Sequence, residues 1–321
     1  MRVFVEVDHI VEFKCLDATI ELKAIFGEFC QIQICAFAQH PIFSGPDSKQ
    51  DRSFWQLAIE RPEVEVIGTT PYVEGSNDLI RSNYKYAVDQ ARRLGKHLDL
   101  HLDYNIDKVQ PIFTNGVLEY VASEGRWDTA SGARIVLSHC TRLTLLSKDD
   151  WNSLSSTIKA NDIPISFVGL PSSDLFIQGK PPPDAGGGER TRGTLQIPQI
   201  IDEYGINGAI AINNLGNAFT PQGPCDPLAL ASWGVGVYQA GATRSVECLF
   251  ECISGRAKEA IGFEHDKGVF VGSRADLIIY KVATGHKAKL SEQRPRLTLQ
   301  DLIYDPPKAR QVVSKGGLVS A

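Results

Sequence analysis

The sequence predicts an α/β fold built on a parallel sheet, and three observations lead to this prediction. Short apolar runs of strand length alternate with amphipathic segments of helix length up to about residue 245, as in repeated βα units. The longest loops, at 179–193 and 213–227, each follow an expected strand, where a parallel barrel places its active site. The 321 residues, 43% hydrophobic and 22% charged, are enough for a large core.

The expected elements follow one another in a regular order. Strands are expected over residues 2–7, 31–37, 64–69, 97–103, 134–139, 163–168 and 208–213. Helices are expected near residues 11–27, 50–61, 79–95, 115–124, 148–160, 196–204, 227–240 and 244–262. Seven strands are one short of a closed TIM-type (β/α)8 barrel, so we expect an incomplete barrel without its first strand and with unpaired edges.

The stretch KHLDLHLDYN (96–105) shows why the fourth run is a strand. Leucine alternates there with four polar residues, His97, Asp99, His101 and Asp103. A period of two places the leucines on one face of a strand and all four polar side chains on the other. A helix would bring the two histidines one turn apart, but it would leave the leucines without a common face.

The last part of the chain changes character. Residues 272–282 and 309–320 have the alternation of short antiparallel strands rather than of further βα units. We therefore expect a barrel domain over residues 1–265 and a small remnant of a β-sandwich domain over residues 266–321.

Charge and cysteine content narrow the choice of partner and compartment. The formal charge is −5 with no long basic run, so a small-molecule ligand is favoured over nucleic acid or an anionic membrane surface. The seven cysteines are scattered and mostly in apolar surroundings, which is typical of reduced thiols in a cytoplasmic protein. No apolar run reaches the roughly 18–20 residues of a membrane span, and the first residues do not resemble a signal peptide.

Polar residues gather at the expected C-terminal ends of the parallel strands. They are Gln39, His101 with Asp103, Ser138 with His139, and Asn213 with Asn214. Each residue alone is more often a hydrogen-bonded structural group than a ligand. His101 and His139 end consecutive strands, so their side chains would converge at one barrel mouth. From the residues alone, a functional pair and a structural pair both remain open.

These residues fall short of a complete metal site. A catalytic zinc or iron centre usually takes three or four nitrogen or oxygen ligands and keeps one position for water. His101 and His139 supply two ligands, and Asp103 is close in sequence. Asn213 and Asn214 offer only amides, which carry no charge and cannot act as general bases. The residues therefore predict a weakly held metal.

The same motifs resemble the amidohydrolase superfamily of metallo-dependent hydrolases, in its cytosine deaminase-like branch. The resemblance rests on HLDLHLDY (97–104), LSHCT (137–141) and GINGAIAINN (205–214) with the later DP (226–227), and it extends to RVFVEVD (2–8), IQICAFAQHPI (32–42), IIYKVATG (278–285) and VVSKGGLVS (312–320). It implies hydrolysis of a carbon–nitrogen bond, other than a peptide bond, in a small heterocyclic or amide substrate. It also implies one divalent metal, zinc or iron.

The resemblance assigns roles residue by residue. It makes His101 a metal ligand and His139 a catalytic residue that supports the metal-bound water. Gln39 and Gln178 become substrate-binding residues, and Asn213 stands where the family has a catalytic aspartate.

Several positions depart from the family pattern. The glutamate expected directly after Asp103 is Tyr104, the aspartate is Asn213, and the first-strand His-x-His pair is not found. General acid–base groups contribute about 10²–10⁴-fold each, so these changes threaten the family reaction. Two hypotheses follow: a hydrolase of carbon–nitrogen bonds, or a catalytically degenerate barrel that binds a small heterocycle or a partner protein. An incomplete barrel is also a candidate for homo-oligomer formation.

Overall fold

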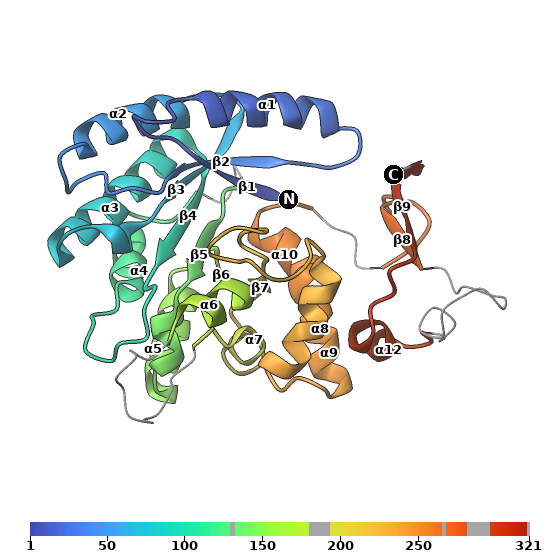
Figure 1. The fold of residues 1–321 in the computed structure, drawn as a ribbon. Helices are drawn as coiled ribbons and strands as arrows, with labels where there is room; N and C mark the ends of the chain where they lie inside the picture. Colours follow the sequence, from blue (N-terminus) through green and yellow to red (C-terminus); the bar gives the residue numbers. More distant parts are fainter. Residues whose placement is uncertain (129–131, 180–192, 265–267, 281–295, 320–321) are drawn as a thin grey trace.

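A computed structural model describes residues 1–128, 132–179, 193–264, 268–280 and 296–319. Its main sheet has seven parallel strands in sequential order: β1 (Arg2–Glu6), β2 (Gln33–Ala38), β3 (Val64–Thr69), β4 (His97–Leu102), β5 (Ile135–His139), β6 (Ile165–Gly169) and β7 (Asn207–Ile210). The sheet curves with helices on its outer side (Figure 1). The predicted α/β fold of TIM type is confirmed, and β1 and β7 are the two edges of the described sheet.

The helices lie between and after these strands. They are α1 (Lys14–Phe26), α2 (Ser48–Ile59), α3 (Asn77–Leu94), α4 (Thr114–Ser123), α5 (Lys148–Ala160), α6 (Pro171–Ile177), α7 (Ile197–Tyr204), α8 (Pro227–Val237), α9 (Thr243–Ile253), α10 (Gly255–Ala260) and α12 (Leu299–Tyr304). Two 3-10 helices, η1 (Pro71–Val73) and η2 (Thr141–Leu145), follow β3 and β5. Within the described ranges, no helix has the length and apolarity needed to cross a membrane.

The observed elements differ from the expected ones in three ways. The seventh strand ends at Ile210, so residues 211–213, expected at its tip, belong to the following loop. The helix expected over 244–262 is divided into α9 and α10, because Ser254 has a non-helical backbone (φ −128°, ψ −99°). Helices α6 and α12 were not expected, since seven and six residues are too few for a clear helical period.

Side chains of the strands alternate between the barrel interior and the helical layer. On β1, Val5 is buried in the core beneath the outer helices, whereas Arg2 bonds inward to Asp99 and the Phe4 ring contacts His101. Period-two alternation therefore places Glu6, the last residue of β1, on the interior face as well. On β4, the three leucines join the main core, as the sequence predicts.

The barrel interior is closely filled beneath its mouth. Cys35, Phe37 and Val66 form a separate buried cluster there. Gly68 on β3 faces this cluster, and a Cβ atom at that position would lie 2.5 Å from Cys35 Sγ and 2.6 Å from Phe37 Cδ2. A glycine is therefore required for the Phe37 ring to pack at this level of the barrel.

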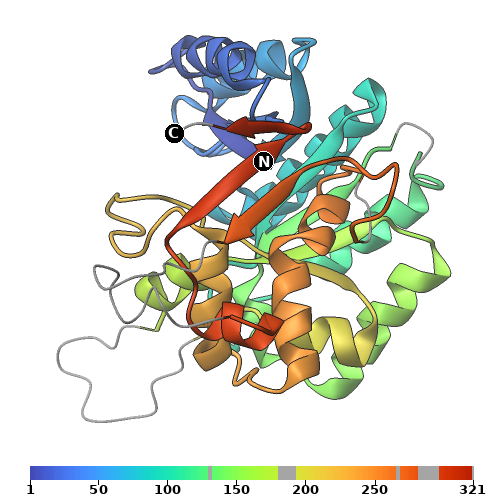
Figure 2. The ribbon, with the colours of Figure 1, turned by 90° about the vertical axis from the view of Figure 1, so that its right-hand side faces the viewer.

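The C-terminal region contains one small antiparallel sheet. Its strands are β8 (Leu277–Tyr280), β9 (Arg310–Ser314) and β10 (Gly317–Val319). Arg310 forms an ion pair with Asp226, the N-cap of α8, and Lys315 Nζ donates to the carbonyl of Gly27 after α1 at 3.3 Å. Helix α12 packs against α8 and α9, so two parts of this region contact the barrel (Figure 2).

Candidate active site

Two buried histidines meet at the C-terminal ends of β4 and β5. The ring centroids of His101 and His139 are 4.9 Å apart in an edge-on arrangement. Phe4 and Phe37 pack against His101, with centroid distances of 5.1 Å and 4.6 Å. Burial lowers the pKa of His101 well below its usual value, and the neighbouring His139 lowers it further. A ligand that enters the mouth would therefore meet His101 as a neutral imidazole.

The other polar residues of the fourth strand have structural partners. His97 Nδ1 accepts a hydrogen bond from the backbone of Arg134 at 3.0 Å. Asp99 is paired with Arg2 at 2.6 Å in the barrel interior. Asp103 accepts three hydrogen bonds from the start of α4, so it caps that helix rather than facing the mouth. Of the four polar residues in this run, only the second histidine remains a candidate ligand.

A buried carboxyl group orients His139. Asp174 Oδ1 lies 2.8 Å from His139 Nδ1, while Asp174 Oδ2 accepts from Thr194 Oγ1 at 2.9 Å. Burial lowers the pKa of His139 to about 3 and raises the pKa of Asp174 to about 8. Both shifts favour neutral side chains, and the contact at Nδ1 leaves Nε2 of His139 for the mouth.

Two tyrosines line the mouth next to this pair. The ring centroids of Tyr104 and His139 are 4.1 Å apart, and those of Tyr104 and Tyr72 are 5.4 Å apart. The buried hydroxyl of Tyr104 has no hydrogen-bond partner among the described residues. Burial raises the pKa of Tyr104 above its usual value, so it is not a general base at neutral pH. The exposed Gln39 follows β2, and its side chain lies near the hydroxyl of Tyr72.

The remaining predicted site residues lie on the loops around the mouth. Gln178 Nε2 donates to the backbone carbonyl of Tyr104 at 3.4 Å. Asn213 is exposed, and its Nδ2 donates to Ser173 Oγ at 2.8 Å, which leaves its Oδ1 as an acceptor. Sequence reasoning missed Asp174, because this residue lies in α6, further beyond the end of its strand than His101, His139, Gln39 or Asn213.

The residues around the histidine pair fit a divalent metal only in part. Neutral imidazoles suit metal binding, and a carboxyl group on the far nitrogen of a ligating histidine is a common arrangement. In the described parts of the chain, however, no third His, Cys, Asp or Glu completes a metal-binding group with His101 and His139. The amide oxygen of Asn213 is the remaining donor from the predicted set. Such a site carries no negative charge and would hold a cation weakly.

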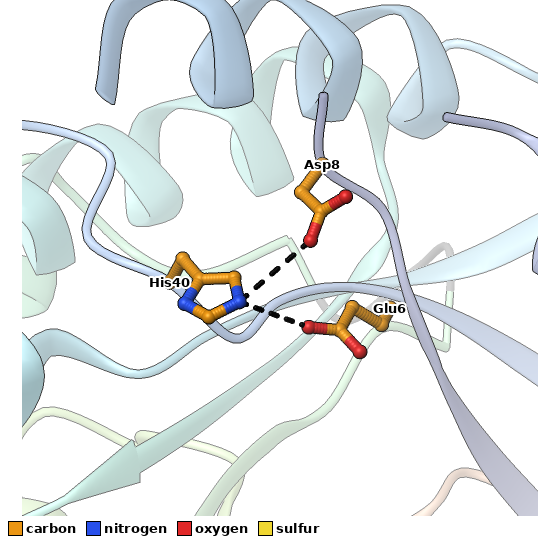
Figure 3. Close-up of side chains that lie close together, drawn as sticks. All are labelled: Glu6, Asp8 and His40. Carbon is orange, nitrogen blue, oxygen red and sulfur yellow. Dashed lines mark ion pairs between the residues drawn. The ribbon is translucent and has the colours of Figure 1, made fainter. Parts of the chain in front are cut away.

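A second group of side chains lies at the ends of β1 and β2. Glu6 Oε1 is 3.4 Å and Asp8 Oδ2 is 3.7 Å from the same atom, His40 Nε2 (Figure 3). Asp8 is 3% exposed, and its Oδ1 accepts from the backbone nitrogens of Ile10 and Val11, both at 2.7 Å. These three residues were not predicted as a site, because only the fold brings the loops after the two strands together.

Comparison with known proteins shows which enzymes share this architecture. No family model matches the chain. An N-isopropylammelide isopropyl amidohydrolase of Pseudomonas sp. (strain ADP) is 22% identical over 279 residues, covering 87% of this chain and 61% of that protein. The 5-methylcytosine deaminase of Klebsiella pneumoniae, liganded with 5-fluorocytosine, has a TM-score of 0.81 at 20% identity, covering 100% of this chain and 70% of its own. The chain has an amidohydrolase fold.

The predicted resemblance to the cytosine deaminase-like amidohydrolases is thereby confirmed. A zinc-bound adenosine deaminase of Xanthomonas campestris shares the amidohydrolase fold with a TM-score of 0.60 at 16% identity, covering 94% of this chain and 63% of that one. The chain spans 61% of the length of the curated amidohydrolase that it matches.

Proposed function

We propose that the barrel mouth hydrolyses a carbon–nitrogen bond, other than a peptide bond, in a small heterocyclic or amide substrate. The observation that carries the proposal is the His101–His139 pair, which lies at the ends of adjacent strands with Asp174 behind it. The relatives reported above support this reaction class, because one is an N-isopropylammelide isopropyl amidohydrolase and the other is a 5-methylcytosine deaminase.

The residues of the mouth divide into binding and proton-holding groups. Gln39 and Gln178 offer amides to the edge of a ring, and the Tyr104 ring offers a surface for stacking. His139 holds a proton in its contact with Asp174 and presents its other nitrogen to a reacting group. Asn213, on the loop after β7, contributes an acceptor oxygen next to Ser173.

One divalent metal, zinc or iron, belongs to this proposal. His101 would hold it, with the oxygen of Asn213 as a weaker donor, and a bound metal would lower the pKa of a water molecule. The absence of a carboxylate from this donor set predicts that metal has to be supplied during the assay.

A second candidate function is binding of a small heterocycle without turnover. Tyr104 favours it, because a tyrosine with a raised pKa stands where the family reaction requires a glutamate. Asn213 favours it too, since an amide replaces the aspartate that would take a proton.

The cellular setting follows from the same proposal. All seven cysteines are free, which agrees with a reducing, cytoplasmic environment. The partner is a small molecule rather than nucleic acid or a membrane, and the open edges of the sheet make a homo-oligomer a further expectation.

The test is a release assay on the purified chain. Cytosine derivatives, alkylamino triazines and small cyclic amides are incubated with added Zn²⁺ or Fe²⁺, and ammonia or amine is measured alongside binding by calorimetry. We expect hydrolysis that is lost in His101→Ala. Binding without hydrolysis would establish the second candidate instead, and the absence of both binding and hydrolysis would contradict both functions.

A further inference from the structure

We propose that Glu6, Asp8 and His40 form a divalent cation site that is separate from the His101–His139 pair. The three side chains provide two carboxylate oxygens and one imidazole nitrogen, all within 4.8 Å of one another. Carboxylate and imidazole together suit first-row divalent ions such as Zn²⁺ and Mn²⁺. This inference concerns cation binding and does not depend on hydrolysis at the mouth.

The spacing of the three ligand atoms suits a metal. With metal–ligand bonds of about 2.0–2.2 Å, neighbouring ligand atoms lie roughly 2.8–3.1 Å apart in an octahedral shell and roughly 3.3–3.6 Å apart in a tetrahedral one. His40 Nε2 is 3.4 Å from Glu6 Oε1 and 3.7 Å from Asp8 Oδ2. The two carboxylate oxygens lie within 4.8 Å of each other, so a shift of the Glu6 side chain toward Asp8 brings all three atoms to one ion.

The charge of the group favours a cation. Glu6 and Asp8 bring two carboxylates together, and in the described parts of the chain neither forms an ion pair with a lysine or arginine. Among the described residues, the imidazole of His40 is the one basic group in ion-pair contact with them. A bound dication would neutralise this local excess of negative charge.

One of the three proposed ligands, Asp8, is held in place, and the other two are open to solvent. Asp8 is buried, and two backbone hydrogen bonds to its Oδ1 hold the carboxylate so that Oδ2 faces the histidine. The side chains of Glu6 and His40 are 41% and 53% exposed, so water or a ligand group can fill the remaining coordination positions. Figure 3 shows one ring nitrogen of His40 facing both carboxylates.

The group also differs chemically from the histidine pair. Glu6 follows Phe4 on the interior face of β1, and Phe4 is the residue that packs on His101. The proposed site therefore starts one interior position further along β1 than the ring that packs on His101. It offers one imidazole nitrogen, whereas the mouth pair offers two.

The experiment titrates the full chain with Zn²⁺ alone, by calorimetry and by elemental analysis after dialysis. We expect one tightly bound equivalent in the native chain that persists in His101→Gln, whereas any weaker binding at the mouth should be lost in that variant. Affinity should fall at least about 10-fold in His40→Gln and in Glu6→Gln, because each removes a direct ligand. His40 is exposed and Glu6 is half-buried, so we expect little change in thermal unfolding, and an unchanged unfolding curve shows that a loss of binding is not a loss of fold.

A spectroscopic measurement separates the two locations. With one equivalent of Cu²⁺, pulsed electron paramagnetic resonance should detect a single coordinated imidazole that disappears in His40→Gln. Two coordinated imidazoles, or binding lost in His101→Gln but kept in His40→Gln, would overturn the proposal. Absence of any bound cation in the native chain would overturn it as well, while leaving the hydrolysis assay above to be decided separately.

Discussion

At the scale of single residues, burial decides what the polar side chains of this barrel can do. The fourth strand offers four polar residues in one alternating run, and three of them are used by a backbone amide, an arginine and a helix terminus. Burial of His139 and Asp174 favours their neutral forms, which sets the protonation of the mouth. The consequences are specific and measurable.

The Asp174–His139 pair should make stability depend on pH. Between pH 3.8 and about 8 the folded chain keeps the Asp174 proton that the unfolded chain releases, so stability falls as pH rises. His139 acts oppositely, but only between about pH 3 and 6.5. From pH 6.5 to 8 only the aspartate of this pair changes the stability, and we expect the free energy of unfolding to fall by an amount on the order of 1 kcal/mol.

Replacement of the carboxyl group tests this dependence. Asp174→Asn keeps the shape and a hydrogen bond to His139 but cannot release a proton, so its stability should be flatter across that range. Urea unfolding at several pH values measures the difference. Parallel curves for the native chain and the variant would show that Asp174 does not titrate there.

At the scale of the elements, close approach inside the barrel fixes the position of the aromatic layer. Phe37 can pack against His101 because β3 carries Gly68 at the facing position. The same interior explains why β4 has no hydrophilic face despite its sequence pattern. Its polar side chains point into a barrel that neighbouring strands fill, and all of its residues after the first are buried.

Gly68→Ala should therefore disturb both packing and the site. The new methyl group would meet Cys35 Sγ and Phe37 at under 3 Å, and overpacking of this kind typically costs about 1–3 kcal/mol. Gly236→Ala on the exposed side of α8 is the matched control, since no atom lies within 4 Å and a helical alanine is favoured by up to about 1 kcal/mol. Thermal unfolding of both variants should shift in opposite directions, and equal shifts would contradict the packing argument.

At the scale of the whole molecule, the small C-terminal sheet is attached to the barrel at a few points. The expected boundary at residue 265 lies outside the described residues, so the division into domains 1–265 and 266–321 stays a proposal. The ion pair between Arg310 and Asp226 joins β9 to the first turn of α8.

Arg310→Ala should loosen this attachment. The hydrogen bond from Arg310 is the main reason that the pKa of Asp226 lies below 3.8. The ion pair therefore stabilises the fold above about pH 4, and this stabilisation is lost as the pH falls further. The expected cost at pH 7 is about 1 kcal/mol. Lys308→Ala, an equal charge change at an exposed residue, should cost less. Faster proteolysis of the C-terminal region in the arginine variant alone would support the prediction, and equal rates would contradict it.

The edges of the main sheet suggest self-association. β1 and β7 have no strand partner on their outer sides in the described chain, and unpaired edges favour contacts with another copy. We expect a homo-oligomer in sedimentation at micromolar concentration. A single species of 35.2 kDa would contradict this expectation.

The sequence by itself determined the order of the strands and helices, since a period of two or of 3.6 is a local property. It also located His101 and His139, because parallel strands bring their C-terminal ends to one face. Tertiary structure alone decided the hydrogen-bond partners of His97, Asp99 and Asp103, because those partners are distant in sequence and only burial made them necessary. It alone brought Asp174 to His139, and Glu6 and Asp8 to His40, since a contact between separate loops leaves no period in the chain.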